Sequence, residues 1–127
     1  MKILLVEDHD GLAKISCDLL RQKYGHEVEH AHSGEAALAC VAKSVPEVVL
    51  LDLNLPDMHG YGLAERLRQM PELANTVLVA LTGFGLTGDP ERSAAVGIDA
   101  HFRKPMDFSE LPNIRRRPAG QPEPRQG

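Results

Sequence analysis

The sequence has few cysteines, no long apolar run and no excess of basic residues. Cys17 and Cys40 lie far apart, in segments that we expect to form different helices, so neither a CxxC redox pair nor a zinc spacing is present. No stretch approaches the roughly 18 consecutive apolar residues of a membrane-spanning helix, and no signal-peptide cleavage pattern follows Met1. We therefore expect a cytoplasmic chain that does not contact a membrane.

Nucleotide and nucleic-acid binding are also disfavoured. The glycines form neither a GxGxxG nor a GxxxxGK motif, so no phosphate-cradling loop is indicated. A formal net charge of -4 gives no general attraction to nucleic acid. His26, His30 and His32 cluster in the sequence, but structural zinc normally needs four converging ligands. We interpret these histidines as solvated polar residues.

The length and composition indicate one globular domain. A chain of 127 residues is large enough to bury a hydrophobic core without metals or disulfides. The hydrophobic share of 43% and the charged share of 25% are typical of a soluble globular protein.

Apolar runs of strand length alternate with helical patterns along the chain. Continuous apolar runs at residues 3–6, 48–51 and 77–81 are typical of strands that are covered on both faces. The more polar residues 27–31 suit an edge strand, and residues 100–102 supply a fifth strand. With right-handed crossovers, this alternation predicts a doubly wound α/β sandwich.

The intervening segments have the periodicity and end signals of helices. The first helix is expected to place Leu12, Ile15, Leu19 and Leu20 on one inward face and to end near Gly25. The second is expected to begin at Ser33, whose hydroxyl can cap it. The third and fourth complete the set, with Leu63 and Leu67 facing inward in the third, and Pro90 and Gly97 bounding the fourth.

Polar residues follow four of the five expected strands. Glu7 and Asp8 come after the first strand, Asp52 closes the third, Thr82 closes the fourth and Lys104 follows the fifth. In open α/β sheets, ligands bind in the crevice beyond the carboxyl ends of the strands. We therefore expect these five side chains to line one crevice.

The chemistry of this crevice favours phosphoryl transfer. Three neighbouring carboxylates repel one another unless a divalent cation neutralises them, and hard oxygen ligands suit Mg²⁺. We expect Asp8 and Asp52 to be direct metal ligands. Asp52 can attack phosphorus to form an aspartyl phosphate, while Lys104 offers a positive charge and Thr82 a hydroxyl donor to the phosphoryl oxygens.

Four motifs, in this order and spacing, resemble those of the receiver domains of bacterial response regulators. They cover roughly residues 1 to 111 and are Glu7-Asp8, Leu51-Asp52-Leu53-Asn54-Leu55-Pro56, Ala80-Leu81-Thr82-Gly83 and Lys104-Pro105. The segment Ala80-Leu81-Thr82-Gly83-Phe84-Gly85, together with Asp99-Ala100-His101, is most similar to receivers of hybrid sensor histidine kinases.

The resemblance implies a flavodoxin-like fold with five parallel strands in the order 2-1-3-4-5 and helices on both faces. It implies a two-component phosphorelay function rather than a classical enzyme, with a sensor histidine kinase or histidine phosphotransfer protein as donor. The output partner stays unknown. It also implies roles for site residues: Asp52 as phosphoacceptor, Glu7 and Asp8 as holders of Mg²⁺, Asn54 as a metal ligand through its backbone carbonyl, Thr82 as switch hydroxyl, Lys104 as phosphate partner and Pro105 after a cis peptide bond.

The first departure from the family pattern is His101, which stands where many receivers carry Tyr or Phe at the switch position. A histidine there can act as a pH-sensitive switch, because its ordinary pKa lies near physiological pH. The alternative is an exposed polar residue on an edge strand, which is the interpretation that we favour.

The second departure is the chain end. Pro112 removes a helical hydrogen bond, so we expect the last helix to be short, shifted or absent. We take residues 1–111 as the receiver domain and residues 112–127, rich in proline and arginine, as a disordered tail. Its arginines are expected to dock on an acidic partner or to touch nucleic acid only non-specifically. Apolar surface left uncovered by a missing helix would favour a homodimer or another partner.

Two other functions stay open at the level of sequence. A phosphohydrolase of the haloacid-dehalogenase type normally needs a second aspartate two positions after the nucleophile, and Asn54 occupies that position. A phosphorylation-independent interaction module would keep the fold and use only its surfaces. The complete set of site residues argues against this second alternative, while His101 and the shortened chain end leave it open.

Overall fold

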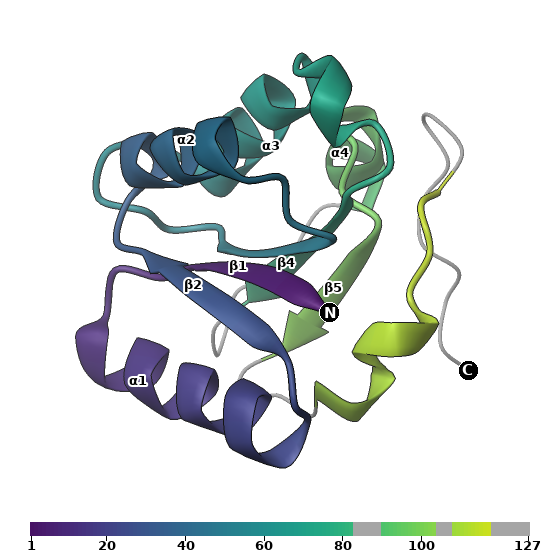
Figure 1. Cartoon of the computed structure of the whole chain (residues 1–127). Helices are drawn as coiled ribbons and strands as arrows, with labels where there is room; N and C mark the ends of the chain where they lie inside the picture. Colours follow the sequence, from purple (N-terminus) through teal and green to yellow (C-terminus); the bar gives the residue numbers. More distant parts are fainter. Residues whose placement is uncertain (83–89, 104–107, 118–127) are drawn as a thin grey trace.

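A computed structural model describes residues 1–82, 90–103 and 108–117. Its centre is a parallel sheet with the strand order β2-β1-β3-β4-β5 (Figure 1). The strands are β1 (Lys2–Val6), β2 (Glu27–Ala31), β3 (Val48–Asp52), β4 (Val77–Thr82) and β5 (Ala100–Arg103). The flavodoxin-like order that the family resemblance implies is confirmed.

Helices cover both faces of the sheet. The α-helices are α1 (Asp10–Asp18), α2 (Gly34–Lys43), α3 (Gly60–Arg68) and α4 (Pro90–Ala95). A π-helical turn η1 (Leu19–Lys23) extends α1, and the 3-10 helices η2 (Pro71–Leu73) and η3 (Phe108–Asn113) complete the described elements. Helices α2, α3 and α4 lie on one side of the sheet and α1 on the other (Figure 1).

Alternation along the strands divides the core in two. Successive strand side chains point to opposite faces, so Leu4 and Val6 of β1 pack in the cluster that contains residues of α2 and α3. Ile3 and Leu5 pack in the other cluster, with residues of α1 and η3. Burial of both faces explains why the central strands are continuous apolar runs rather than alternating sequences.

The buried face of α1 differs from the predicted one. Leu12 and Ile15 are 44% and 66% exposed, whereas Ala13, Cys17 and Leu20 are buried against the sheet. Small side chains at 13 and 17 let the helix approach the strands closely, and this stripe has the same helical spacing as the larger residues. The prediction that Leu12 and Ile15 face inward is therefore wrong.

The last helix is short, as predicted, and residues beyond it contact the rest of the domain. The 3-10 helix η3 spans the predicted boundary at residue 112, and Ile114 packs against the core. Arg116 and Arg117 then contact Asp99 of the same chain. Residues 112–117, which we predicted to belong to a disordered tail, thus take part in these contacts, and two of the tail arginines contact an acidic residue of the same chain. The domain boundary at residue 111 stays a prediction.

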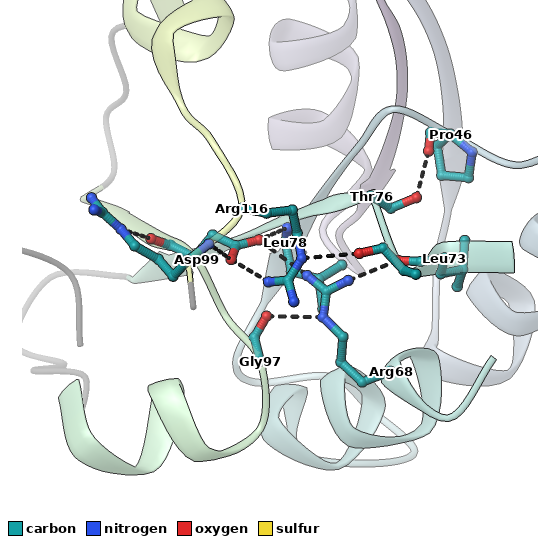
Figure 2. Close-up of polar contacts among 10 residues, drawn as sticks. Pro46, Arg68, Leu73, Thr76, Leu78, Gly97, Asp99 and Arg116 are labelled. Carbon is teal, nitrogen blue, oxygen red and sulfur yellow. Dashed lines mark hydrogen bonds and ion pairs between the residues drawn. The ribbon is translucent and has the colours of Figure 1, made fainter. Parts of the chain in front are cut away.

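Asp99 is the centre of this contact, at the end of the sheet where β4 and β5 begin (Figure 2). Its side chain is fully buried. Oδ2 accepts hydrogen bonds from Arg68 at 3.0 Å and from the Leu78 amide at 2.9 Å, while Oδ1 accepts from the Arg116 guanidinium and the Arg117 amide. Burial and the neighbouring Arg116 lower the pKa of Arg68 to about 10, and Asp99 opposes this shift.

Within the residues that the structure describes, no helix has the length and apolar character needed to cross a membrane.

Candidate functional site

Three carboxylates converge at the carboxyl ends of β1 and β3. One ligand oxygen from each of Glu7, Asp8 and Asp52 lies within 4.8 Å of the others. Strands β1 and β3 are parallel neighbours with Val6 opposite Leu51, so the residues that follow Val6 emerge beside Asp52. Glu7 and Asp52 are buried, at 3% and 7% exposure, and Asp8 is exposed. The structure thus brings Glu7, Asp8 and Asp52 together, as the sequence predicts.

Backbone and side-chain contacts hold Glu7 in place. Its amide donates to the Ala31 carbonyl at 3.0 Å, which extends the pairing of β1 with β2. Its Oε1 accepts from the His9 amide at 3.2 Å, and the His9 ring in turn caps α1 by accepting from Leu12. The start of α1 therefore fixes the direction of the acidic pair Glu7 and Asp8.

A second contact to Glu7 comes from β2. His30 Nε2 lies 2.7 Å from the Glu7 carbonyl oxygen, and the ring is partly buried. The interpretation of His30 as solvated is therefore wrong. His32 is exposed and pairs with Asp10 at 2.9 Å. Among the described residues, the histidines are not part of the carboxylate group that could hold a metal ion.

The loop after β3 orients Asp52. The Asn54 amide donates to Asp52 Oδ1 at 2.9 Å, which fixes one oxygen of the carboxylate. The base of the loop is closed by an isolated bridge between Asn54 and His59 and by a hydrogen bond from the Gly60 amide to the Leu53 carbonyl. A Cβ at position 60 would lie 2.6 Å from the Asp52 carbonyl oxygen, so this close approach requires glycine.

Thr82 closes β4 beside the cluster. Asp52 lies opposite Leu81 in the β3–β4 ladder, so Thr82 is the next residue along the neighbouring strand. Its side chain is 5% exposed, and Oγ1 donates a long hydrogen bond of 3.4 Å to the Phe102 carbonyl. Lys104 and Pro105, predicted as phosphate partner and cis-peptide residue, lie outside the described residues.

The chain matches the family described as the response regulator receiver domain over residues 3–116. It belongs to this family.

Relatives and solved structures agree with this assignment. The receiver domain is 33% identical over 110 residues to sporulation initiation phosphotransferase F of Bacillus subtilis, covering 87% of this chain and 86% of the relative. A putative response regulator from Chloroflexus aurantiacus is 32% identical with a TM-score of 0.76, covering 87% and 90% of the two chains.

A second similar structure carries a metal. The receiver domain of a sensor histidine kinase from Pseudomonas aeruginosa is described with a magnesium ion coordinated in its active site cleft. It is 28% identical to this receiver domain, with a TM-score of 0.75 and coverage of 87% and 90% of the two chains. The specific similarity to receivers of hybrid kinases stays a prediction.

The donor set of this receiver domain fits Mg²⁺. Hard carboxylate oxygens from Glu7, Asp8 and Asp52 lie within reach of one small cation, and Mg²⁺ is typically bound by one or two carboxylates together with water and phosphate oxygens. Close carboxylates repel one another, so a divalent cation there would relieve an existing repulsion.

His101 is placed differently from our prediction. Its ring is partly buried, and Nε2 lies 2.7 Å from Ser93 Oγ. Ser93 is itself buried and also hydrogen bonds to the Tyr61 hydroxyl at 2.9 Å. The interpretation of His101 as an exposed polar residue is therefore wrong, because a buried hydroxyl on α4 offers its ring a partner and links β5 to α3.

Sequence reasoning missed the roles of Ser93, Tyr61 and Asp57. Asp57 accepts hydrogen bonds from the amides of Gly34 and Glu35 at the start of α2. The unsatisfied amides of a helix N-terminus signal that some acceptor must be found. Neither periodicity nor spacing identifies a residue of a distant loop as that acceptor.

Proposed function

We propose that this receiver domain accepts a phosphoryl group on Asp52 from a phosphohistidine of a sensor histidine kinase or histidine phosphotransfer protein. The observation that carries the proposal is the convergence of Glu7, Asp8 and Asp52 within 4.8 Å at the carboxyl ends of two neighbouring strands. The relative named as a phosphotransferase and the solved receiver described with magnesium support the same chemistry.

The reaction is a substitution at phosphorus. An Asp52 carboxylate oxygen forms the new O–P bond, the N–P bond of the phosphohistidine breaks, and the leaving imidazole takes a proton from water. The hydrogen bond from the Asn54 amide to Oδ1 orients the carboxylate before the donor arrives. Reaction rate then depends on positioning and charge stabilisation rather than on a separate catalytic base.

The proposed metal ligands are the carboxylates of Glu7, Asp8 and Asp52 and the backbone carbonyl of Asn54. Bound Mg²⁺ would neutralise charge on the carboxylates and on the phosphoryl oxygens. We further propose that Lys104 pairs with a phosphoryl oxygen.

Thr82 is proposed as the switch. Within the part of the chain that the structure describes, its hydroxyl donates a long hydrogen bond of 3.4 Å to the Phe102 carbonyl. A bond of this length is weak, so it opposes movement of Thr82 toward a phosphoryl group on the neighbouring strand only a little. Such movement would change the surface near α4 and β5, where a partner reads the phosphorylation state. His101 lies on that surface and is held by Ser93.

The test is incubation of the chain with acetyl phosphate and Mg²⁺, followed by intact-mass analysis. We expect one phosphoryl adduct on the wild type, no adduct on Asp52→Asn, and loss of the adduct when EDTA replaces Mg²⁺. Absence of an adduct on the wild type, also with a phosphohistidine donor, would instead favour a phosphorylation-independent interaction module.

A further inference from the structure

The loop between β3 and α3 carries Asn54, whose carbonyl is a proposed metal ligand. At its base, the loop is closed by the single bridge between Asn54 and His59 and by the Gly60 amide on the Leu53 carbonyl at 2.8 Å. An isolated bridge fixes only two residues of the backbone. The position of the Asn54 carbonyl therefore also depends on what holds the tip of the loop.

The tip is held by Asp57, which binds another element with both carboxylate oxygens. Oδ1 accepts from the Gly34 amide at 2.9 Å, and Oδ2 accepts from the Glu35 amide at 3.0 Å. These two backbone hydrogen bonds lower the pKa of Asp57, and the bond from the Glu35 amide has the larger effect. A charged carboxylate at a helix N-terminus is favoured by the helix dipole and by the amides that have no partner within the helix.

An apolar contact accompanies this polar one. A Cβ built on Gly34 would lie 2.4 Å from Met58 Sδ, so the Met58 side chain rests directly on the first residue of α2. Met58 also packs against the core cluster on that face of the sheet. Two consecutive loop residues thus dock on the same turn of α2.

Helix α2 has a cap of its own. Ser33 Oγ accepts from the Ala36 amide at 3.1 Å, and the Ser33 carbonyl accepts from the Ala37 amide at 3.0 Å. The start of α2 is therefore defined by local residues. The contact with Asp57 joins this preformed helix end to the loop by hydrogen bonds, beside the apolar packing of Met58.

We infer that Asp57 is a positioning residue for the metal site, which holds the Asn54 carbonyl in place by anchoring the loop tip to α2. This inference rests on the proposed function, because it assigns Asp57 a role toward the Mg²⁺ of that site. Asp57 does not belong to the carboxylate group of Glu7, Asp8 and Asp52. It acts through the loop backbone.

The matched pair of variants is Asp57→Ala and Ser33→Ala. Each removes an acceptor from the same end of α2, but only Asp57 belongs to the loop. With the full chain and Mg²⁺ alone, titration calorimetry should show roughly tenfold weaker binding for Asp57→Ala, the lower end of what outer-shell partners of metal ligands cost. Ser33→Ala should bind Mg²⁺ within about twofold of the wild type, because it leaves the loop contacts intact.

Two further measurements separate positioning from general destabilisation. At saturating Mg²⁺, the phosphorylation rate of Asp57→Ala with acetyl phosphate should return to near the wild-type value, since the defect lies in metal affinity. Asp57→Asn keeps one acceptor oxygen and should recover part of the affinity. Glu35→Gln removes an exposed carboxylate from the same turn, keeps the amide and should leave the affinity unchanged.

Equal Mg²⁺ affinity in Asp57→Ala and the wild type, or equal losses in Asp57→Ala and Ser33→Ala, overturns the positioning role. Should Asp57→Ala fail to fold, Asp57→Asn provides the same comparison. Absence of Mg²⁺ binding by the wild type contradicts the proposed function instead. Amide hydrogen exchange of the metal-free protein then decides the anchoring separately: the hydrogen-bonded amides of Asn54 and Gly60 should exchange faster in Asp57→Ala than in Ser33→Ala.

Discussion

Three aspartates of this receiver domain have three different environments. Asp52 lies among other carboxylates. Asp57 is an exposed loop residue that contacts the start of α2, and Asp99 is fully buried between two guanidinium groups. The same side chain is thereby suited to metal binding, to anchoring a loop and to closing the end of the sheet. Only the strand-end position of Asp52 has a clear signal in the sequence.

The lowered pKa of Asp57 predicts a pH dependence of stability. A carboxyl whose pKa is lower in the folded than in the unfolded state stabilises the fold above its unfolded pKa, near 3.8, and loses this contribution as pH falls through the folded pKa. Urea unfolding should show a constant stability difference between wild type and Asp57→Ala above about pH 5 and a shrinking difference below it. A difference that persists unchanged at the acid limit would contradict this.

The site residues differ in how far the sequence predicts them. Glu7, Asp8, Asp52 and Thr82 follow apolar runs directly, and parallel strands bring their carboxyl ends to one edge, so the clustering follows from the pattern. The hydrogen-bond partner of His101 cannot be predicted from the sequence pattern. Ser93 reaches it from α4, and the orientation of a short helix against a strand depends on packing that one sequence does not display.

At the level of elements, the strands are predicted better than the helix faces. A strand buried on both faces needs no choice of face, so the central strands follow directly from their composition. Helix α1 requires a choice between two stripes of similar spacing. Large residues suggest Leu12 and Ile15, but close approach of the helix to the sheet selects Ala13 and Cys17.

The contacts of the segment after η3 predict that the free energy of unfolding depends strongly on where the chain ends. Oδ1 of Asp99 has Arg116 and Arg117 as its donors, so a chain that ends at Arg115 leaves this buried oxygen without either. Loss of partners for a buried polar atom costs about 1–3 kcal/mol. Urea unfolding should show this loss for the chain that ends at Arg115.

The matched control is the chain that ends at Arg117, which keeps both donors. We expect its free energy of unfolding to equal that of the full chain, and we propose that the folded domain extends through Arg117. Equal stability of the two shortened chains would show that the contacts of Asp99 with the chain end contribute nothing.

At the scale of the whole molecule, metal binding should be linked to folding. The carboxylate cluster exists only when β1 and β3 are paired, so Mg²⁺ binds the folded state in preference to the unfolded state. At a concentration roughly a hundred times Kd, this linkage stabilises the fold by about 2.7 kcal/mol. Thermal melts should therefore shift upward in Mg²⁺ relative to EDTA for the wild type and much less for Asp8→Asn; identical melts would contradict the metal site.

The parallel arrangement of the strands also determines where the molecule can be attached to something else. All five strands begin at one edge of the sheet, where the Met1 amino group lies 3.0 Å from His26 Nδ1, and they end at the edge that holds Asp52. A strand of five residues spans about 15 Å. A fluorophore or a solid support coupled to the Met1 amine would thus lie at the edge of the sheet opposite Asp52 and leave the Asp52 edge accessible to a docking protein.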